Sequence, residues 1–163
     1  SSDIHIGIDR CAQKRLLKID GHRVWMVNTH LHHLKEDFQI RKAQAEGLIT
    51  WMELDVLADD AVFLTLDMND HRDSSCYKLF IEAGFKSAYR TVNGDEPAFT
   101  FPTGLKAPYM DTDGHLSADY VFYRGPIKPV RADLFGNECD PNDMTIYPSD
   151  HYGVWADFEF TSQ

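Results

Sequence analysis

The sequence predicts an α/β fold, in which strands and helices follow one another within a single domain over residues 1–163. Three observations support this prediction: a hairpin signal near the start, a long amphipathic segment followed by a short apolar run, and three strand-like runs toward the end. Composition agrees, because 163 residues can bury a core and 43% hydrophobic with 26% charged residues is typical of globular proteins.

The hairpin signal lies in the first thirty residues. Residues 11–19 (CAQKRLLKI) have strand character, and a strand resumes at 24–27 (VWMV). Between them, Asp20-Gly21 is a dipeptide that favours a two-residue hairpin turn. The second strand would therefore deliver the segment 28–33 (NTHLHH) to its carboxyl end.

A helix is predicted from residue 36 to about 57, because apolar side chains recur there at helical spacing. Residues 61–66 (AVFLTL) form a short apolar run, which indicates a buried strand. Asp73 is the predicted N-cap of a second helix that continues through Ile81, and Gly84 is placed just after its end.

The second half of the chain contains fewer helical signals. Residues 85–116 are rich in glycine and proline and are predicted to be mostly loop, where substrate contacts are often found. Strands are predicted at 118–123 and 127–135, paired through Gly125-Pro126, and a last strand covers 153–160.

Charge and cysteine content narrow the function classes. The net charge is −10, which argues against broad salt-driven binding to duplex phosphates but leaves single-stranded nucleic acid and small phosphorylated molecules open. No apolar run approaches the roughly 20 residues that span a bilayer. The three cysteines are far apart and odd in number, which favours reduced thiols and an intracellular compartment.

Polar side chains gather where the predicted strands end or begin. They are two imidazoles, three carboxylates and one amide, and they come from four separate stretches: His30, Asp67, Asn69, Asp119, Asp150 and His151. Strand ends in a packed sheet hold such groups rigidly. Carboxylates supply the hard oxygen ligands that Mg²⁺ prefers, and imidazole can move a proton near neutral pH. This set suits metal-assisted hydrolysis of a phosphate ester.

Structural interpretations compete at the neighbouring polar positions. His32 and His33 are expected to be loop or supporting residues, and a zinc site made of His30 with these two is the less favoured alternative, because adjacent strand residues point in opposite directions. Arg41 and Gln44 share one helix face and are expected to brace it.

Four motifs, in this order, resemble those of the endonuclease/exonuclease/phosphatase superfamily. They are NTHLHH at 28–33, LDMND at 66–70, ADYVFY at 118–123 and PSDH at 148–151. The resemblance extends from about residue 10 to the end of the chain. It implies a mostly antiparallel β-sandwich flanked by helices, four layers in the full family domain.

The resemblance also implies roles for the clustered residues. His30 matches a phosphate-stabilising histidine, Asp119 the partner of the catalytic histidine, and His151 that histidine itself. Asp67 and Asn69 match a pair that engages metal and phosphate, and the implied ligands of Mg²⁺ or Mn²⁺ are Asp67, Asn69 and Asp150.

Two departures from the family pattern bear on the expectation. Leu66 stands where the family has a glycine. The family's early strands supply a metal-binding Asn and Glu, and no residue before position 10 matches either. The chain is therefore expected to be the C-terminal half of the domain, with exposed apolar surface and with the N-terminal half or a second copy of itself as partner.

Three functions remain open from the sequence. The first is a divalent-metal-dependent phosphodiesterase or nuclease, with a phosphorylated substrate such as single-stranded nucleic acid. The second is a phosphatase or phospholipase C-like enzyme that acts on small phosphorylated molecules or lipid headgroups. The third is a truncated, inactive fragment with a binding or structural role.

Overall fold

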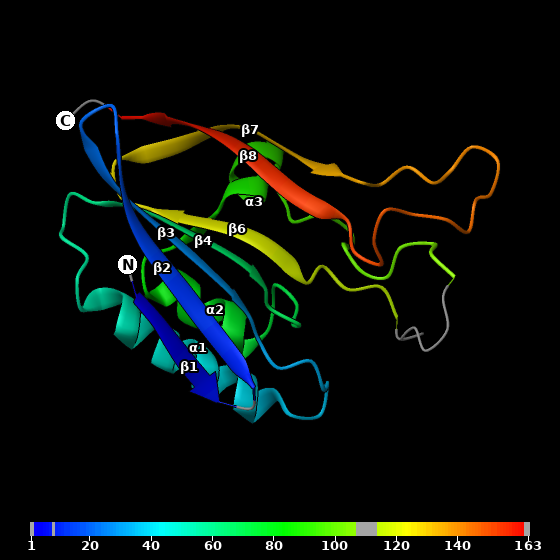
Figure 1. The fold of residues 1–163 in the computed structure, drawn as a ribbon, viewed down its shortest axis with the longest axis horizontal. Helices are drawn as coiled ribbons and strands as arrows, with labels where there is room; N and C mark the ends of the chain where they lie inside the picture. Colours follow the sequence, from blue (N-terminus) through cyan, green and yellow to red (C-terminus); the bar gives the residue numbers. More distant parts are fainter. Residues whose placement is uncertain (1, 8, 107–113, 162–163) are drawn as a thin grey trace.

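The computed structural model describes residues 2–7, 9–106 and 114–161. Its larger sheet has the strand order β1-β2-β3-β4-β6-β5 (Figure 1). The bounds of these strands are β1 Ser2–Gly7, β2 Arg10–Ile19, β3 His22–His30, β4 Ala61–Asp67, β5 Lys86–Ser87 and β6 Asp119–Arg124. All neighbours are antiparallel except β3 and β4, which are parallel because α1 connects them.

The predicted hairpin is confirmed as β2–β3. Ile19 lies opposite His22, which leaves Asp20 and Gly21 as the two turn residues. Both have positive φ, 50° and 86°, as the type I′ turn requires. This turn fixes the register of β3, and that register brings His30 beside the end of β4.

Two helices cover one face of the larger sheet (Figure 1). They are α1, Phe38–Glu53, and α2, Ser75–Glu82, so α1 is shorter at both ends than the predicted 36–57. Their apolar sides bury the main core against alternate residues of the central strands, including Val27, Leu64 and Phe122. The described helices are all too short or too polar to cross a membrane.

Two residues, Asp73 and Gly84, were predicted at the ends of α2. The prediction of Asp73 as N-cap was wrong: the cap is Ser74, whose side chain accepts a hydrogen bond from the Tyr77 amide. Ser74 is extended while Asp73 lies one position too early to reach that amide. Gly84 is confirmed just past the helix end, with φ of 85°, and the amide of Phe85 bonds back to Phe80.

A second sheet of two strands lies over the other face. It consists of β7, Ile127–Phe135, and β8, Gly153–Phe160, which pair antiparallel. The predicted pairing of β7 with the preceding strand was wrong. Gly125, with φ of 97°, lies directly against the backbone of Asp60, and there the chain leaves the first sheet for the second.

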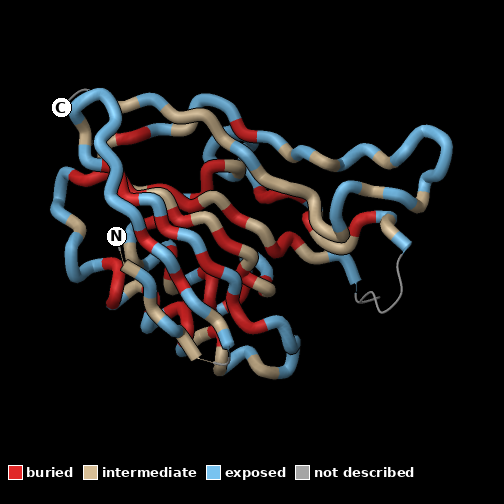
Figure 2. The backbone as a smooth tube through the Cα atoms, viewed as in Figure 1, coloured by how far each residue is buried: buried red, intermediate tan, exposed pale blue. Residues whose placement is uncertain are grey.

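The two sheets are joined mainly at one end. Phe158 of β8 contacts Phe63 edge-on, with ring centroids 4.7 Å apart, and Tyr123 at 5.4 Å. Beyond this small core, Met26, Val121 and Trp155 line an apolar groove of about 350 Å³. Figure 2 shows the difference, since buried residues concentrate in the central strands, while β7 is mostly and β8 wholly intermediate or exposed. The exposed apolar surface expected from the sequence is therefore present.

The sequence missed three short elements. Strand β1 was not predicted, and the stretch interpreted as loop contains β5 and the helix α3, Ala88–Asn93. Elsewhere in that stretch, residues 95–106 and 114–118 belong to no helix or named strand. Together with the segment between β7 and β8, it extends beyond the strand ends at one side of the molecule (Figure 1).

Candidate active site

Strand register brings three of the candidate residues side by side. His30 ends β3 and lies opposite Asp67, the last residue of the parallel strand β4. Asp119 begins β6, and because β6 runs antiparallel to β4, it also lies opposite Asp67. All three belong to the face that carries the second sheet, since Thr29, Leu66 and Tyr120 are the residues that turn to the buried helical side.

His151 reaches this strand end from the segment that precedes β8. The neighbouring backbone is tied to the loop before β6: the Thr103 amide donates to Asp150 O at 2.9 Å, and the Tyr152 amide donates to Thr100 O at 2.8 Å. The His151 amide also donates to Ser149 Oγ at 3.1 Å. These bonds hold the histidine although it lies outside regular structure.

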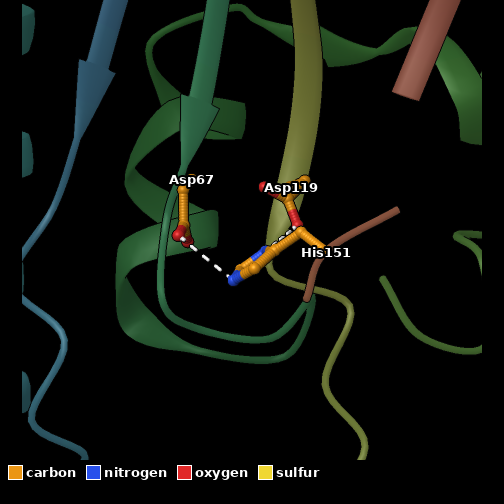
Figure 3. A group of neighbouring side chains, drawn as sticks. All are labelled: Asp67, Asp119 and His151. Carbon is orange, nitrogen blue, oxygen red and sulfur yellow. Dashed lines mark hydrogen bonds and ion pairs between the residues drawn. The ribbon is translucent and has the colours of Figure 1, made fainter. Parts of the chain in front are cut away.

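His151 and Asp119 form a hydrogen-bonded pair. The His151 Nδ1 atom is 2.8 Å from Asp119 Oδ2, within hydrogen-bond distance, as the resemblance implied for these two residues (Figure 3). Burial lowers the pKa of His151, but the bond to Asp119 and the nearby carboxylates outweigh it and raise the pKa above its usual value. The bond also fixes the tautomer, so that Nε2 is the nitrogen left for a substrate.

Thr100 supports this pair from behind. Its hydroxyl donates to Asp119 Oδ2 at 2.6 Å and accepts from the Ala118 amide at 2.9 Å and the Asp119 amide at 3.1 Å. The side chain is fully buried. Asp119 is therefore held by two donors, and its orientation toward His151 is fixed before any ligand binds.

Asp67 is the most perturbed carboxylate of the site. Its Oδ2 lies 3.9 Å from His151 Nε2 and 3.2 Å from His30 Nε2. Burial, and after it the charge of Asp119, raise the pKa of Asp67 to about 6. Ligand atoms of Asp67, Asp119 and His151 lie within 4.8 Å of one another, and a cation beside them would offset the repulsion between the two carboxylates.

Asn69 stands on a tight turn directly after β4. It has φ of 51°, which asparagine tolerates better than most residues, and its amide donates to Asp67 Oδ1 at 2.9 Å. Its side-chain nitrogen donates to Leu31 O at 3.0 Å and lies 2.9 Å from His30 Nε2. Burial, and then the charge of Arg10, lower the pKa of His30, which favours the neutral ring that can accept this bond.

The leucine that replaces the family's glycine does not enter the site. Leu66 is 5% exposed and belongs to the main core on the helical side of β4. The adjacent Asp67 points to the opposite face, as alternation along a strand requires. The departure at this position therefore leaves the strand end open.

The other sequence candidates lie around this cluster. The Asp150 carboxylate accepts from Ser149 Oγ at 3.2 Å and is not among the three grouped ligands in the part of the chain that the structure describes. His32 is buried and bonds Asp37 at 2.9 Å, so the three clustered histidines do not share a metal position. Gln44 accepts from the His32 amide and braces the same loop.

Arg41, which was predicted to support its own helix, also forms hydrogen bonds outside that helix. Its guanidinium donates to the carbonyls of Leu34 at 2.5 Å and Lys35 at 3.1 Å, and its Nε donates to Asp70 at 3.3 Å. It thereby shapes the loop that follows β3.

Sequence reasoning missed Thr100 and Phe101. Both lie in the stretch interpreted as loop, yet the ring of Phe101 lies 4.6 Å from that of His151, centroid to centroid. The alternation of Phe99, Thr100 and Phe101 before a proline was a weak signal of extended chain. A pairing of Phe101 with Leu116 confirms that conformation.

Comparison with solved structures identifies the fold. Similar structures include D. rerio TDP2 complexed with a single-strand DNA product, with a TM-score of 0.73 and 19% identity over 92% of this chain. An endonuclease/exonuclease/phosphatase from Bacteroides vulgatus gives 0.70 and 22% over 93%, and a mannosyl-6-phosphatase from Bacteroides thetaiotaomicron gives 0.72 and 20% over 96%. No protein-family model matches the sequence, and neither does any curated protein.

The chain spans 62%, 56% and 61% of the lengths of these three structures. It shares the fold of these structures, one of which is an endonuclease/exonuclease/phosphatase, and this is the fold that its motifs predicted. The predicted α/β class with a mostly antiparallel sheet and flanking helices is confirmed with it.

Proposed function

We propose that this chain belongs to a divalent-metal-dependent hydrolase of phosphate esters, of the phosphodiesterase or nuclease type. The observation that carries the proposal is the His151–Asp119 pair, with the free Nε2 of the histidine directed at the carboxylate of Asp67. A fixed imidazole beside an acidic strand end is suited to moving a proton to or from a group that attacks phosphorus.

Each residue of the proposed site has a distinct task. His151 exchanges a proton at Nε2, and Asp119 holds the ring and stabilises its charged form. One N–H of Asn69 donates to Leu31 O and the other points at His30 Nε2. A phosphate oxygen that replaces His30 as acceptor would receive this second N–H, and His30 would donate to the phosphate once its Nε2 is protonated. Asp67 lies between them, where a carboxylate without a counter-charge would repel an anionic substrate.

The donor set fits a hard divalent cation. Asp67 is the principal proposed ligand, since Asp119 is already engaged by Thr100 and His151. Asn69 and Asp150 are the additional proposed ligands. Bound Mg²⁺ or Mn²⁺ would neutralise the phosphate and stabilise the charge that develops on it.

The proposed substrate is a phosphodiester, with single-stranded nucleic acid as the main candidate. One structural neighbour holds a single-strand DNA product, and the net charge of −10 disfavours a broad duplex-binding surface. A phosphatase acting on a small phosphorylated molecule is the second candidate, because a mannosyl-6-phosphatase is about equally similar in fold, with a TM-score of 0.72.

Hydrolysis of a short single-stranded oligonucleotide and of a sugar monophosphate, with and without Mg²⁺ or Mn²⁺, tests the proposal. His151→Ala should reduce turnover by about a thousandfold or more, and adding Asp119→Ala should cost little further, because the two act as a unit. His5→Ala changes an exposed histidine on β1 and serves as the control. Independent, multiplicative losses from the two site variants would contradict the pair mechanism.

A metal titration separates binding from turnover. Amide chemical shifts near Asp67 should respond to Mg²⁺ in the wild type and lose that response in Asp67→Ala combined with Asp150→Ala. Stoichiometric, tight binding that survives the double substitution would remove these two residues from the metal site. A chain that neither binds the ion nor hydrolyses either substrate would leave the inactive binding fragment as the remaining interpretation.

A further inference from the structure

A second concave surface adjoins the candidate active site. It is a cavity of about 350 Å³, formed where the loop after β3, the turn after β4 and the segment before β6 meet. Asn69 and Phe101 line it, and both also contact the site, at His30 and His151 respectively. A substrate bound at the site could therefore extend into this cavity without leaving the protein surface.

The cavity is lined by side chains that can donate hydrogen bonds to an anion. Its described residues include Lys35 and three exposed histidines, His33, His71 and His115. Asp70 is the acid among the described lining residues, and it is paired with the buried Arg41. With the histidines neutral, Lys35 is the formal charge that Asp70 does not offset among the described lining residues, in a chain of net charge −10.

The loop that carries Lys35 is held in place from below. Arg41 donates to the carbonyl oxygens of Leu34 and Lys35, and its Nε atom contacts Asp70 at 3.3 Å. Because these donors are occupied, Arg41 acts as the support, and Lys35 is left to face a ligand. The Asp73 amide donates to His71 Nδ1 at 3.2 Å and Arg10 lies 3.4 Å from His33 Nδ1, so Nε2 is the nitrogen that these two rings offer to a ligand. Phe99 stacks on His115 at 4.2 Å between ring centroids, which orients that imidazole as well.

We propose that this cavity, which we call the second phosphate subsite, binds another phosphate group of the substrate, next to the one that reacts. The inference rests on the proposed function and deepens it, because it makes substrates with at least two phosphates the preferred class. Ammonium and imidazole donors form the charge-assisted hydrogen bonds that a phosphate favours. The second phosphate can come from a neighbouring nucleotide or from a bisphosphorylated small molecule.

A binding experiment tests the subsite without requiring turnover. Inorganic pyrophosphate is titrated into the 163-residue chain while the imidazole signals of His33, His71 and His115 are followed by NMR. Lys35→Gln and His115→Gln should each weaken binding by about fivefold to tenfold. Lys18→Gln, the same change on an exposed residue of β2, is the matched control and should leave binding unchanged.

A kinetic experiment identifies the source of the phosphate. The ratio of kcat/KM for pTpT over TpT, which differ by one terminal phosphate, is compared with the ratio for a hexose bisphosphate over the hexose monophosphate. Lys35→Gln should lower the ratio for the physiological class about tenfold. A drop in the first ratio alone points to nucleic acid, and a drop in the second alone to a small molecule.

The outcomes separate the two proposals. Lys35-dependent pyrophosphate binding without any hydrolysis keeps the subsite and rejects the proposed function. Hydrolysis whose substrate ratios and pyrophosphate affinity are unaffected by both substitutions rejects the subsite and keeps the function. If Lys35→Gln and Lys18→Gln weakened pyrophosphate binding equally, the loss would come from the change in net charge alone, and the subsite would also be rejected.

Discussion

At the scale of single residues, the site depends on side chains that hold other side chains. Thr100 orients the Asp119 carboxylate by a hydrogen bond, and Arg41 holds the backbone of the loop after β3. The motif resemblance implied the Asp119–His151 contact, and the contact gives the partly buried carboxylate of Asp119 the partner that it needs. The sequence did not predict Thr100, since a hydroxyl buried under a loop has no periodic signal.

Thr100→Val should disturb the Asp119–His151 pair through the hydrogen bond that Thr100 donates to Asp119. The substitution removes a donor to Asp119 and leaves the buried amides of Ala118 and Asp119 without their acceptor. We expect a loss of about 1–3 kcal/mol in the free energy of unfolding. The titration of His151, followed by NMR, should also shift, whereas Thr100→Ser keeps the hydroxyl and should restore both properties. Identical His151 titrations in the valine and wild-type proteins would show that Thr100 is structural only.

Glu96 gives a pH-dependent stability with a defined sign. It is 6% exposed and accepts from Tyr77 at 2.7 Å and Ser87 at 2.9 Å, yet burial outweighs these bonds and raises the pKa of its carboxyl above 4.5. Because the folded pKa is the higher one, the stabilisation is complete below the unfolded value near 4.5 and is lost as pH rises through the folded value.

Glu96→Gln should therefore gain stability over the wild type as pH rises. The neutral amide retains an acceptor for the Tyr77 hydroxyl and carries no charge to desolvate. Thermal unfolding at pH 4 and pH 7 measures the difference, which should be larger at pH 7. Glu82→Gln, on the exposed end of α2, is the control. A gain that is equal at both pH values would contradict the burial argument.

At the scale of elements, most strands and the β2–β3 hairpin were predicted correctly, whereas the partner of β7 was not. The Asp20-Gly21 turn, β4 and the bounds of β7 and β8 follow from turn chemistry, apolar runs and alternation. The partner of β7 does not, because it depends on the direction in which the chain leaves Gly125. Likewise β5 and α3 are too short for periodicity to show, and they exist because they pack against β6 and β7.

Two glycine-to-alanine changes should act in opposite directions. Gly125 has φ of 97°, and an added Cβ would collide with the backbone of Asp60. Gly125→Ala should therefore lower the free energy of unfolding by about 1–3 kcal/mol or more. Gly47 lies inside α1 with no atom within 4 Å of an added Cβ, so Gly47→Ala should raise it by about 0.5–1 kcal/mol.

Chemical denaturation of both variants measures this contrast. Both variants add the same methyl group, so a difference between them reports only the backbone conformation and the space around each glycine. If Gly125→Ala were as stable as the wild type, the turn between the sheets would have to be formed differently.

At the scale of the whole molecule, the site lies where the two sheets diverge. They are joined through the small core around Phe63, Tyr123 and Phe158, and the candidate site residues lie at the opposite ends of the same strands. His30, Asp67 and Asp119 could be predicted to meet once the strands were assigned, because strand ends share an edge. The position of His151 relative to them required the second sheet, and no local pattern specifies how that sheet docks.

Phe158→Ala should loosen the second sheet and, with it, His151. Phe158 is the ring that contacts both Phe63 and Tyr123, and β8 begins directly after the histidine segment. Because Phe158 is only partly buried, we expect a loss of about 2–3 kcal/mol, below the range for a fully buried ring. Amide hydrogen exchange should accelerate in β7 and β8 more than in β3 and β4, and the Asp119–His151 contact should weaken in parallel.

Phe135→Ala removes a ring that is 57% exposed on the same strand pair and should change exchange little. Uniform acceleration across both sheets in Phe158→Ala would instead mean that they unfold as one unit, with the histidine held by the Thr100–Tyr152 backbone bond rather than by the docking of β8.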